Sequence, residues 1–164
     1  MTNILKAALE ASEMGFPVFP ADPTTKRPLV KDWPNVATRD PEQIKKFWIQ
    51  FPNAMIGAVT GIQSGWVAID IDVKGGESAF QKLKAFENLH GKKFNPAFCT
   101  ETGSKGLHLF FPAPEGINIR NSASKIGQGW DIRSTGGYVI FAGSVKSDGN
   151  SYKFINFEEA YNNA

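Results

Sequence analysis

Apolar residues recur along the chain at two different periods, which predict helices in some segments and strands in others. After Thr2, the helical period predicts an amphipathic helix that ends at Gly15. Asp40 followed by Pro41 is typical of an N-cap with proline in the first turn, and it predicts a second helix. We interpret the aromatic stripe of this second helix as core packing. The apolar positions of the two helices are Ile4, Leu5, Ala8 and Leu9, then Ile44, Phe47, Trp48 and Phe51.

Shorter apolar runs bounded by glycine, proline or asparagine predict strands. These runs cover residues 16–20, 55–60, 66–73, 96–102, 107–111, 130–134, 138–142 and 152–155. We expect the strand at 66–73 to pair antiparallel with the strand at 55–60, because only the short turn 61–65 separates them.

A third helix is predicted to end at Gly91 and to pack on the sheet, and a short last helix to begin near Glu158. The apolar positions of the third helix are Phe80, Leu83, Phe86 and Leu89. Residues 21–33 read as a basic, proline-rich loop and residues 112–128 as a mobile polar loop. The chain is therefore predicted to be α/β (α+β), with a mixed, mostly antiparallel sheet and flanking helices, in a single domain over residues 1–164.

Composition excludes several classes of protein. The apolar runs at 54–60 and 138–142 are too short to cross a bilayer, which predicts a cytoplasmic protein without a membrane partner. Cys99 is the only cysteine, so an intramolecular disulfide and a thiolate zinc site are excluded. The net charge of +2 permits contact with phosphates but does not by itself indicate a nucleic-acid-binding protein.

Two carboxylates lie two positions apart in the predicted strand at 66–73. Because successive strand residues face opposite sides, Asp70 and Asp72 share one face, opposite Val67, Ile69 and Ile71. Two adjacent anions repel each other unless a divalent cation that prefers oxygen ligands lies between them. The pair predicts Mg²⁺ or Mn²⁺, and the alternative is an edge strand with two solvated aspartates.

A third carboxylate emerges from the predicted strand at 130–134. Alternation places Asp131 and Arg133 on the face opposite Trp130 and Ile132. Three aspartates suffice to bridge two metal ions that clamp the attacking and leaving oxygens of a phosphoryl transfer. The alternative is that Asp131 only forms an ion pair with Arg133.

A glycine-bracketed turn at 103–106 precedes a lone histidine. His108 points away from the side that Leu107 and Leu109 bury, and backbone N–H groups of such a turn can bind phosphate oxygens. Ser104, Lys105 and Gly106 would contribute to a triphosphate site together with His108, although the signature of a P-loop is absent. The alternative is a structural histidine with a satisfied hydrogen bond.

The order of these motifs, Asp-x-Asp, a small-residue turn leading to histidine, and hydrophobic-Asp, resembles the archaeo-eukaryotic primase superfamily. The resemblance is specifically to the Prim-Pol (bifunctional DNA primase/polymerase) domains of phage and plasmid replication proteins, and it covers nearly the whole chain. Further matching segments are 15–20, Lys26-Arg27-Pro28 with Trp33, 56–61, 136–140, Gly143-Ser144 and Gly149.

The resemblance implies a metal-dependent nucleotidyltransferase of DNA replication whose fold has an RRM-like catalytic half. Asp70, Asp72 and Asp131 match the metal-binding carboxylates of the family, His108 matches the histidine that contacts the incoming triphosphate, and Ser104 matches the small residue of that motif. Phosphate contacts by Lys105 and Arg133 are inferred from charge and position. The implied partners are a single-stranded or primed DNA template, nucleoside triphosphates and a helicase domain or protein, with the isolated domain a monomer.

Basic side chains outside these motifs are candidates to hold template or primer phosphates, and Trp33 could stack on a base or pack in the core. These basic residues are Lys26, Arg27, Lys31, Arg120 and Lys125. We expect extension of a primer in preference to synthesis of one. Two other functions remain open: a metal-dependent nuclease, and a noncatalytic module that binds nucleotide or DNA for a replication helicase.

Overall fold

The computed structural model describes all residues from Met1 to Ala164 and contains five helices and nine strands. The helices are α1 (Asn3–Glu13), α2 (Trp33–Val36), α3 (Pro41–Gln50), α4 (Ala79–His90) and α5 (Phe157–Asn162). The strands are β1 (Val18–Ala21), β2 (Met55–Val59), β3 (Trp66–Ile71), β4 (Phe98–Glu101), β5 (Leu107–Pro112), β6 (Ser122–Gly127), β7 (Trp130–Arg133), β8 (Tyr138–Ile140) and β9 (Lys153–Ile155).

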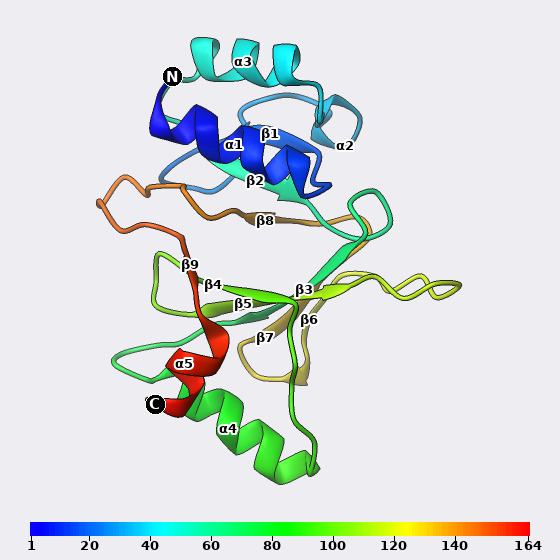
Figure 1. Ribbon diagram of the computed structural model, residues 1–164, viewed down its shortest axis with the longest axis vertical. Coiled ribbons are helices and arrows are strands. Elements are labelled where there is room, and N and C mark those ends of the chain that lie inside the picture. The colour runs from blue at the N-terminus through cyan, green and yellow to red at the C-terminus, as the bar shows by residue number, and fades with distance from the viewer.

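The strands form two antiparallel sheets. The small sheet has the order β1-β2-β8 and the large sheet has the order β6-β7-β3-β5-β4-β9. In Figure 1, α1 and α3 cover the outer side of the small sheet, and α4 and α5 lie below the large sheet at the opposite end of the molecule. The predicted α+β class with antiparallel strands and flanking helices is confirmed, but the strands are divided between two sheets.

Helices α1 and α3 begin and pack as the hydrophobic pattern predicts. The Thr2 side chain accepts a hydrogen bond from the backbone of Leu5, and Asp40 caps α3 in the same way. Ile44 and Trp48 are buried in a cluster that also contains residues of both sheets. Trp48 is therefore core and Phe47 packs against it, whereas Phe51 follows the end of α3 and is only partly buried. This cluster joins the small sheet to the large one.

Helix α4 packs on the outer face of the large sheet, where its Leu83 joins a buried cluster with residues of β3 and β5. The prediction for Leu89 is wrong, because this side chain is 80% exposed. Glu87 is buried in the same part of the helix, and its carboxylate accepts hydrogen bonds from the backbone of Phe94 and from the Tyr161 hydroxyl. A polar side chain can occupy this buried position because both partners lie beside it.

Strand β3 does not pair with β2, contrary to the prediction. It pairs with β5 and β7 in the large sheet, while β2 lies between β1 and β8 in the small sheet. The turn 61–65 carries the chain from one sheet to the other. Gly61 permits this passage, because it has φ +90° and a Cβ there would lie 2.2 Å from the backbone nitrogen of Thr135.

Part of the predicted mobile loop is also ordered as a strand. Within residues 112–128, β6 pairs with β7 and contains an irregularity between Ala123 and Gly127. The amide oxygen of Asn121 accepts a 2.7 Å hydrogen bond from the backbone of Ser134, which holds the start of this strand. The structure contains no helix that combines the length and the apolar character needed to cross a bilayer.

Candidate active site

The register of the large sheet brings four polar side chains into one row. Asp131 on β7 lies opposite Asp70 on β3, Asp70 lies opposite His108 on β5, and His108 lies opposite Thr100 on β4. Directly opposed residues of antiparallel strands project to the same face of a sheet. Residues that are far apart in the sequence are therefore neighbours on the face that is turned toward the small sheet.

The three aspartates form an acidic cluster, which we define as Asp70, Asp72 and Asp131. Each contributes a carboxylate oxygen, and these oxygens all lie within 4.8 Å of one another. Asp70 and Asp131 are partly buried, whereas Asp72 is exposed. Oxygen donors at this spacing suit a hard divalent cation.

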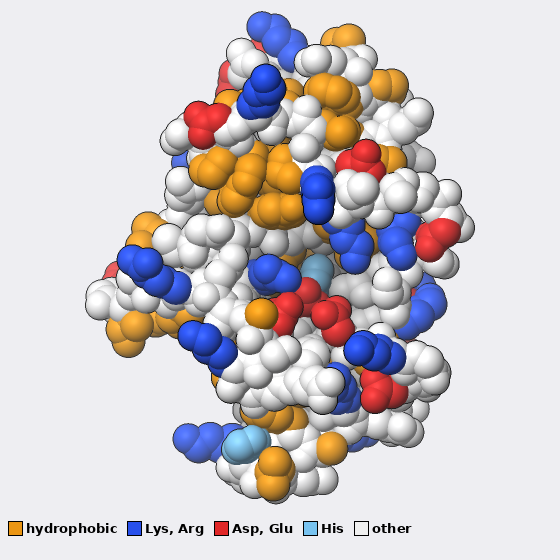
Figure 2. All heavy atoms as spheres, turned by 180° about the vertical axis from the view of Figure 1, so that it is seen from behind, with side chains coloured by type: hydrophobic (Ala, Val, Ile, Leu, Met, Phe, Trp, Pro, Cys, Tyr) orange, Lys and Arg blue, Asp and Glu red, His pale blue; other side chains and the backbone are white.

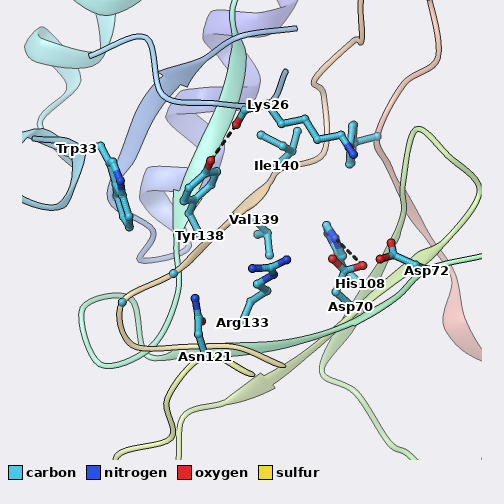
Figure 3. A pocket seen from close by; sticks show the side chains of 13 residues that line it. Lys26, Trp33, Asp70, Asp72, His108, Asn121, Arg133, Tyr138, Val139 and Ile140 are labelled. Atoms are coloured by element: carbon cyan, nitrogen blue, oxygen red, sulfur yellow. Dashed lines mark hydrogen bonds and ion pairs between the residues drawn. The ribbon is translucent and has the colours of Figure 1, made fainter. Parts of the chain in front are cut away.

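A cleft of about 300 Å³ lies beside this cluster, between the two sheets. Asp70, Asp72 and His108 form its floor on the large sheet, and Tyr138 from β8 lies on the opposite wall, as Figure 3 shows. Figure 2 shows the acidic side chains in a hollow with a histidine and several Lys and Arg side chains nearby. The cleft thus combines clustered carboxylates with surrounding positive charge.

His108 and Asp70 face each other inside the cleft. The His108 Nε2 atom lies 3.4 Å from Oδ1 of Asp70, within ion-pair distance when the imidazole is protonated. Oδ1 of Asp70 and Nδ1 of His108 are nevertheless buried without a hydrogen-bond partner, and so is the hydroxyl of Thr100. Buried polar atoms are seldom left unpaired in proteins, so the buried Asp70 oxygen fits a site that is completed by a bound cation.

Burial and the neighbouring charges shift the pKa values of two aspartates of the acidic cluster. Burial alone would raise the pKa of Asp70, but the charge of His108, followed by those of Arg133 and Lys26, outweighs burial and lowers this pKa. Burial, and then repulsion from Asp70 and Asp131, raises the pKa of Asp72. Both neighbouring carboxylates thus repel the negative charge of Asp72, and a cation at the cluster would relieve this repulsion.

Asp131 is held by two contacts. Its Oδ2 atom lies 3.2 Å from the Arg133 guanidinium, and its Oδ1 atom accepts a 3.0 Å hydrogen bond from the backbone of Ser124. The sequence left open whether Asp131 is a member of a carboxylate cluster or an ion-pair partner of Arg133. The structure places it in both arrangements at once, and the Arg133 side chain also lines the cleft.

The glycine turn does not reach the cleft. None of Ser104, Lys105 and Gly106 lines it, and the Lys105 ammonium lies 3.2 Å from the Glu101 carboxylate. The hydroxyl of Ser104 is 3.4 Å from the Lys146 ammonium. The turn joins β4 to β5 as predicted, but the structure brings only His108 of this motif to the acidic cluster.

Lys26 enters the cleft from the loop between β1 and α2. The Asp22 carboxylate accepts hydrogen bonds from the backbone of Thr24 and Thr25, and the Lys26 backbone donates to the Asp22 carbonyl. The Tyr138 hydroxyl in turn donates a 2.9 Å hydrogen bond to the Lys26 carbonyl. The predicted basic loop is thus a compact turn that directs one cation into the site.

Several cleft residues were not identified from the sequence. Asn121 and Tyr152 line the cleft, yet neither belongs to a motif with an obvious chemical signature. Tyr138 also lines it; this residue lies in the matching segment 136–140, but the sequence assigned it no role. Trp33 also lines it, with its ring centroid 5.1 Å from that of Tyr138, so it both packs on the core and borders the site. The other basic candidates, which are Arg27, Lys31, Arg120 and Lys125, do not line the cleft.

A mixed α+β protein whose cleft combines a metal-competent carboxylate cluster with Lys26 and Arg133 has the features expected of a nucleotidyltransferase-type enzyme. The chain belongs to the Prim-Pol family, described as bifunctional DNA primase/polymerase, N-terminal, which matches residues 8–163. Family membership indicates DNA primase/polymerase activity in general, with metal dependence and binding of DNA and nucleotides. No curated protein matches the chain.

Proposed function

We propose that this protein catalyses template-directed nucleotidyl transfer to a DNA primer, with Mg²⁺ or Mn²⁺ held by Asp70, Asp72 and Asp131. The observation that carries the proposal is the convergence of these carboxylate oxygens within 4.8 Å, with one buried Asp70 oxygen left without a hydrogen bond. Bound divalent ions supply charge neutralisation at the phosphates and lower the pKa of an attacking hydroxyl.

The triphosphate of the incoming nucleotide binds on the side of the cleft where the cations converge. His108 and Arg133 rise from the large sheet, and Lys26 approaches from the loop above it, as Figure 3 shows. These groups donate hydrogen bonds to phosphate oxygens and offset their negative charge, which strengthens as the leaving group forms. Enclosure between the two sheets limits access of water and thus strengthens these interactions.

The glycine turn is a proposed contact for the terminal phosphate. Tyr152 lines the cleft and packs beside Gly103, so the turn begins directly behind the wall of the cleft. The Lys105 ammonium would leave Glu101 to reach a phosphate, and this exchange costs little because an exposed ion pair contributes about 0–1 kcal/mol. Ser104 and Gly106 would offer the hydroxyl and the backbone N–H of the same turn.

In the reaction, the 3′-hydroxyl oxygen of the primer forms a bond to the α-phosphorus and the bond from this phosphorus to the β-phosphate oxygen breaks. Pyrophosphate leaves and the hydroxyl proton passes to water. No residue of the chain needs to form a covalent bond with the substrate. Positioning and electrostatic stabilisation are therefore the contributions of this site.

Primer extension tests the proposal directly. A labelled primer on a DNA template is incubated with Mn²⁺ and either deoxyribonucleotides or ribonucleotides, using the parent protein, Asp70→Asn and the matched control Glu115→Gln. Asp70→Asn keeps the size of the side chain and removes one ligand charge, so we expect extension to fall by at least about 100-fold. Glu115 is exposed in a loop and carries no ion pair, so its variant should extend like the parent.

Three outcomes would refute the proposal. If the parent shortens the labelled strand when nucleotides are omitted, the cluster serves hydrolysis and the protein is a nuclease. If the parent binds nucleotide but adds none to a primer, it is a noncatalytic module. Extension by Asp70→Asn at the parental rate would show that the acidic cluster has no part in the reaction.

A further inference from the structure

Three buried polar side-chain atoms have no hydrogen-bond partner, and two of them belong to directly opposed residues. These two are Oγ1 of Thr100 and Nδ1 of His108, and the third is Oδ1 of Asp70. Thr100 on β4 lies opposite His108 on β5. Directly opposed residues have Cβ atoms about 4.5–5.5 Å apart, so changes of side-chain torsion alone can bring the hydroxyl and the ring nitrogen within hydrogen-bonding distance.

His108 is the neighbour of Thr100 that has a free polar atom. On the sheet face that Thr100 occupies, Phe98 and Thr102 flank it along β4, and Phe154 lies opposite it on β9. The two phenylalanines have no polar side-chain atom, and Oγ1 of Thr102 already accepts a backbone hydrogen bond. Among these side chains, the imidazole of His108 is therefore the partner available to the Thr100 hydroxyl.

Thr100 can act on the reaction only through another residue. Its side chain is fully buried and does not line the cleft, whereas His108 does. Rings pack beside the imidazole, with the centroids of Phe110 and Tyr152 lying 6.1 and 6.2 Å from its own. Ring packing restricts where the imidazole lies, but a hydrogen bond to one ring nitrogen fixes the direction and the protonation of the other.

We propose that Thr100 is a positioning residue that directs the Nε2–H of His108 at the triphosphate. Without nucleotide, Nε2 lies 3.4 Å from Oδ1 of Asp70, as Figure 3 shows. With the triphosphate in the cleft, His108 turns its Nε2–H from Asp70 to a phosphate oxygen. The Thr100 hydroxyl then forms a hydrogen bond with Nδ1 and holds the ring in this orientation. This inference rests on the proposed function, in which His108 contacts the triphosphate.

The contact is possible for either charge of the imidazole. A hydroxyl donates a hydrogen bond to a bare Nδ1 and accepts one from a protonated Nδ1. Nε2 carries a proton in both cases, because a neutral ring with a bare Nδ1 has its single proton on Nε2. Valine at position 100 would keep the shape of the side chain and remove the hydroxyl, so it isolates this contact.

The first test measures binding of a fluorescent nucleoside triphosphate by anisotropy, in Ca²⁺ and without primer. It compares the parent with Thr100→Val, with Thr100→Ser and with the control Cys99→Ala, whose buried side chain packs in a cluster with α4. We expect Thr100→Val to bind about fivefold more weakly, the usual effect of losing one hydrogen bond. Thr100→Ser keeps the hydroxyl, so it should match the parent within about twofold, as should Cys99→Ala.

Two further measurements connect the loss to His108. In the background of His108→Phe, which keeps a ring and lacks both nitrogens, Thr100→Val should change the affinity for the triphosphate by less than about twofold. The chain has only two histidines, so ¹⁵N NMR of histidine-labelled protein resolves His108 from His90. With triphosphate bound, the Nδ1 signal of His108 should differ between the parent and Thr100→Val, while the His90 signals coincide.

Primer extension with Mn²⁺ separates this role from a general disturbance of the site. Thr100→Val should raise KM for the nucleotide about fivefold and leave KM for the primed template unchanged. A rise of both KM values together would contradict a contact that acts only through His108.

The inference is overturned if Thr100→Val binds the triphosphate like the parent. It is also overturned if Thr100→Ser loses as much affinity, if the loss persists in the His108→Phe background, or if the Nδ1 signal is the same in both proteins. The binding and NMR measurements need no catalysis. A parent that binds the triphosphate but adds none to a primer therefore refutes the proposed function, whereas an active parent with an unaffected Thr100→Val variant refutes only the role of Thr100.

Discussion

The acidic cluster should lower the free energy of unfolding of the metal-free protein and raise that of the metal-bound protein. Asp72→Asn tests both effects. Asp72 is the best position for this change because its carboxylate makes no ion pair and accepts no hydrogen bond from another residue, so charge is the main property that the substitution removes. Repulsion from Asp70 and Asp131 already raises the pKa of Asp72, after burial as the larger cause.

The size of the effect follows from the spacing of the oxygens. Two unit charges 4.8 Å apart repel each other by about 0.9 kcal/mol in bulk water and by about 3.5 kcal/mol at an effective dielectric constant of about 20. Asp72 is exposed, so the lower value applies to each of its two neighbours, and the charges of His108 and Lys26 offset part of the sum. We expect a net stabilisation of about 1 kcal/mol, or about 2–4 °C in Tm.

Thermal unfolding in the presence of a chelator, and then with Mn²⁺, gives the required measurements. Without metal, Asp72→Asn should melt at a higher temperature than the parent. With Mn²⁺ at about 100 times its Kd, the parent should gain about 2.7 kcal/mol and overtake the variant, which has lost a ligand. Glu115→Gln, which removes an exposed carboxylate away from the cluster, should follow the parent in both conditions.

A variant that melts below the parent in chelator would contradict this repulsion, since the Asp72 carboxylate would then be stabilising by itself. An equal gain in Tm with Mn²⁺ for both proteins would contradict the role of Asp72 as a metal ligand. A metal bound elsewhere on the chain would produce this second result.

Three further predictions concern positions around the site. Gly106→Ala should destabilise the protein by about 1–3 kcal/mol in urea unfolding, because the new Cβ would lie 2.4 Å from the Ile71 carbonyl oxygen; an unchanged unfolding midpoint would contradict this close approach. Thr100→Val should leave the free energy of unfolding unchanged or raise it by up to about 1 kcal/mol, since it replaces a buried, unpaired hydroxyl by a methyl group of similar shape, and a marked loss would show that the hydroxyl has a partner. Cys99 should react with a thiol reagent at pH 8 at least about 1,000-fold more slowly in the native protein than in urea, because burial raises its pKa to about 12 and keeps it protonated; comparable rates would contradict this burial.

The local features of this protein were predictable because they depend on neighbouring residues. The caps Thr2 and Asp40 and the apolar spacing after each of them predict α1 and α3. Both signals involve residues within about one helical turn of each other. In the same way, strand alternation predicts that Asp70 and Asp72 share a face, since a period of two is a property of any strand. The order of the motifs was sufficient to identify the family.

Pairing between strands was decided only by the tertiary structure. Proximity along the chain favoured β2 as the neighbour of β3, but Gly61 carries the chain into a second sheet and β3 pairs with β5 and β7 instead. This pairing sets Asp131 opposite Asp70, and no local pattern contains that information. Register depends on which side chains fill the core between distant segments, and the sequence pattern of either strand alone is compatible with several neighbours.

The tertiary structure also decided which residues form the wall of the cleft opposite the acidic cluster. The sequence alone determined three acidic side chains, one histidine and the faces that they occupy on their own strands. The tertiary structure brought Lys26 and Tyr138 over that face, joined by a hydrogen bond between segments more than a hundred residues apart. Burial of Ala68 and Phe110 together with residues of α1, α3 and the small sheet holds the two layers together, because apolar surfaces exclude water irrespective of their separation along the chain.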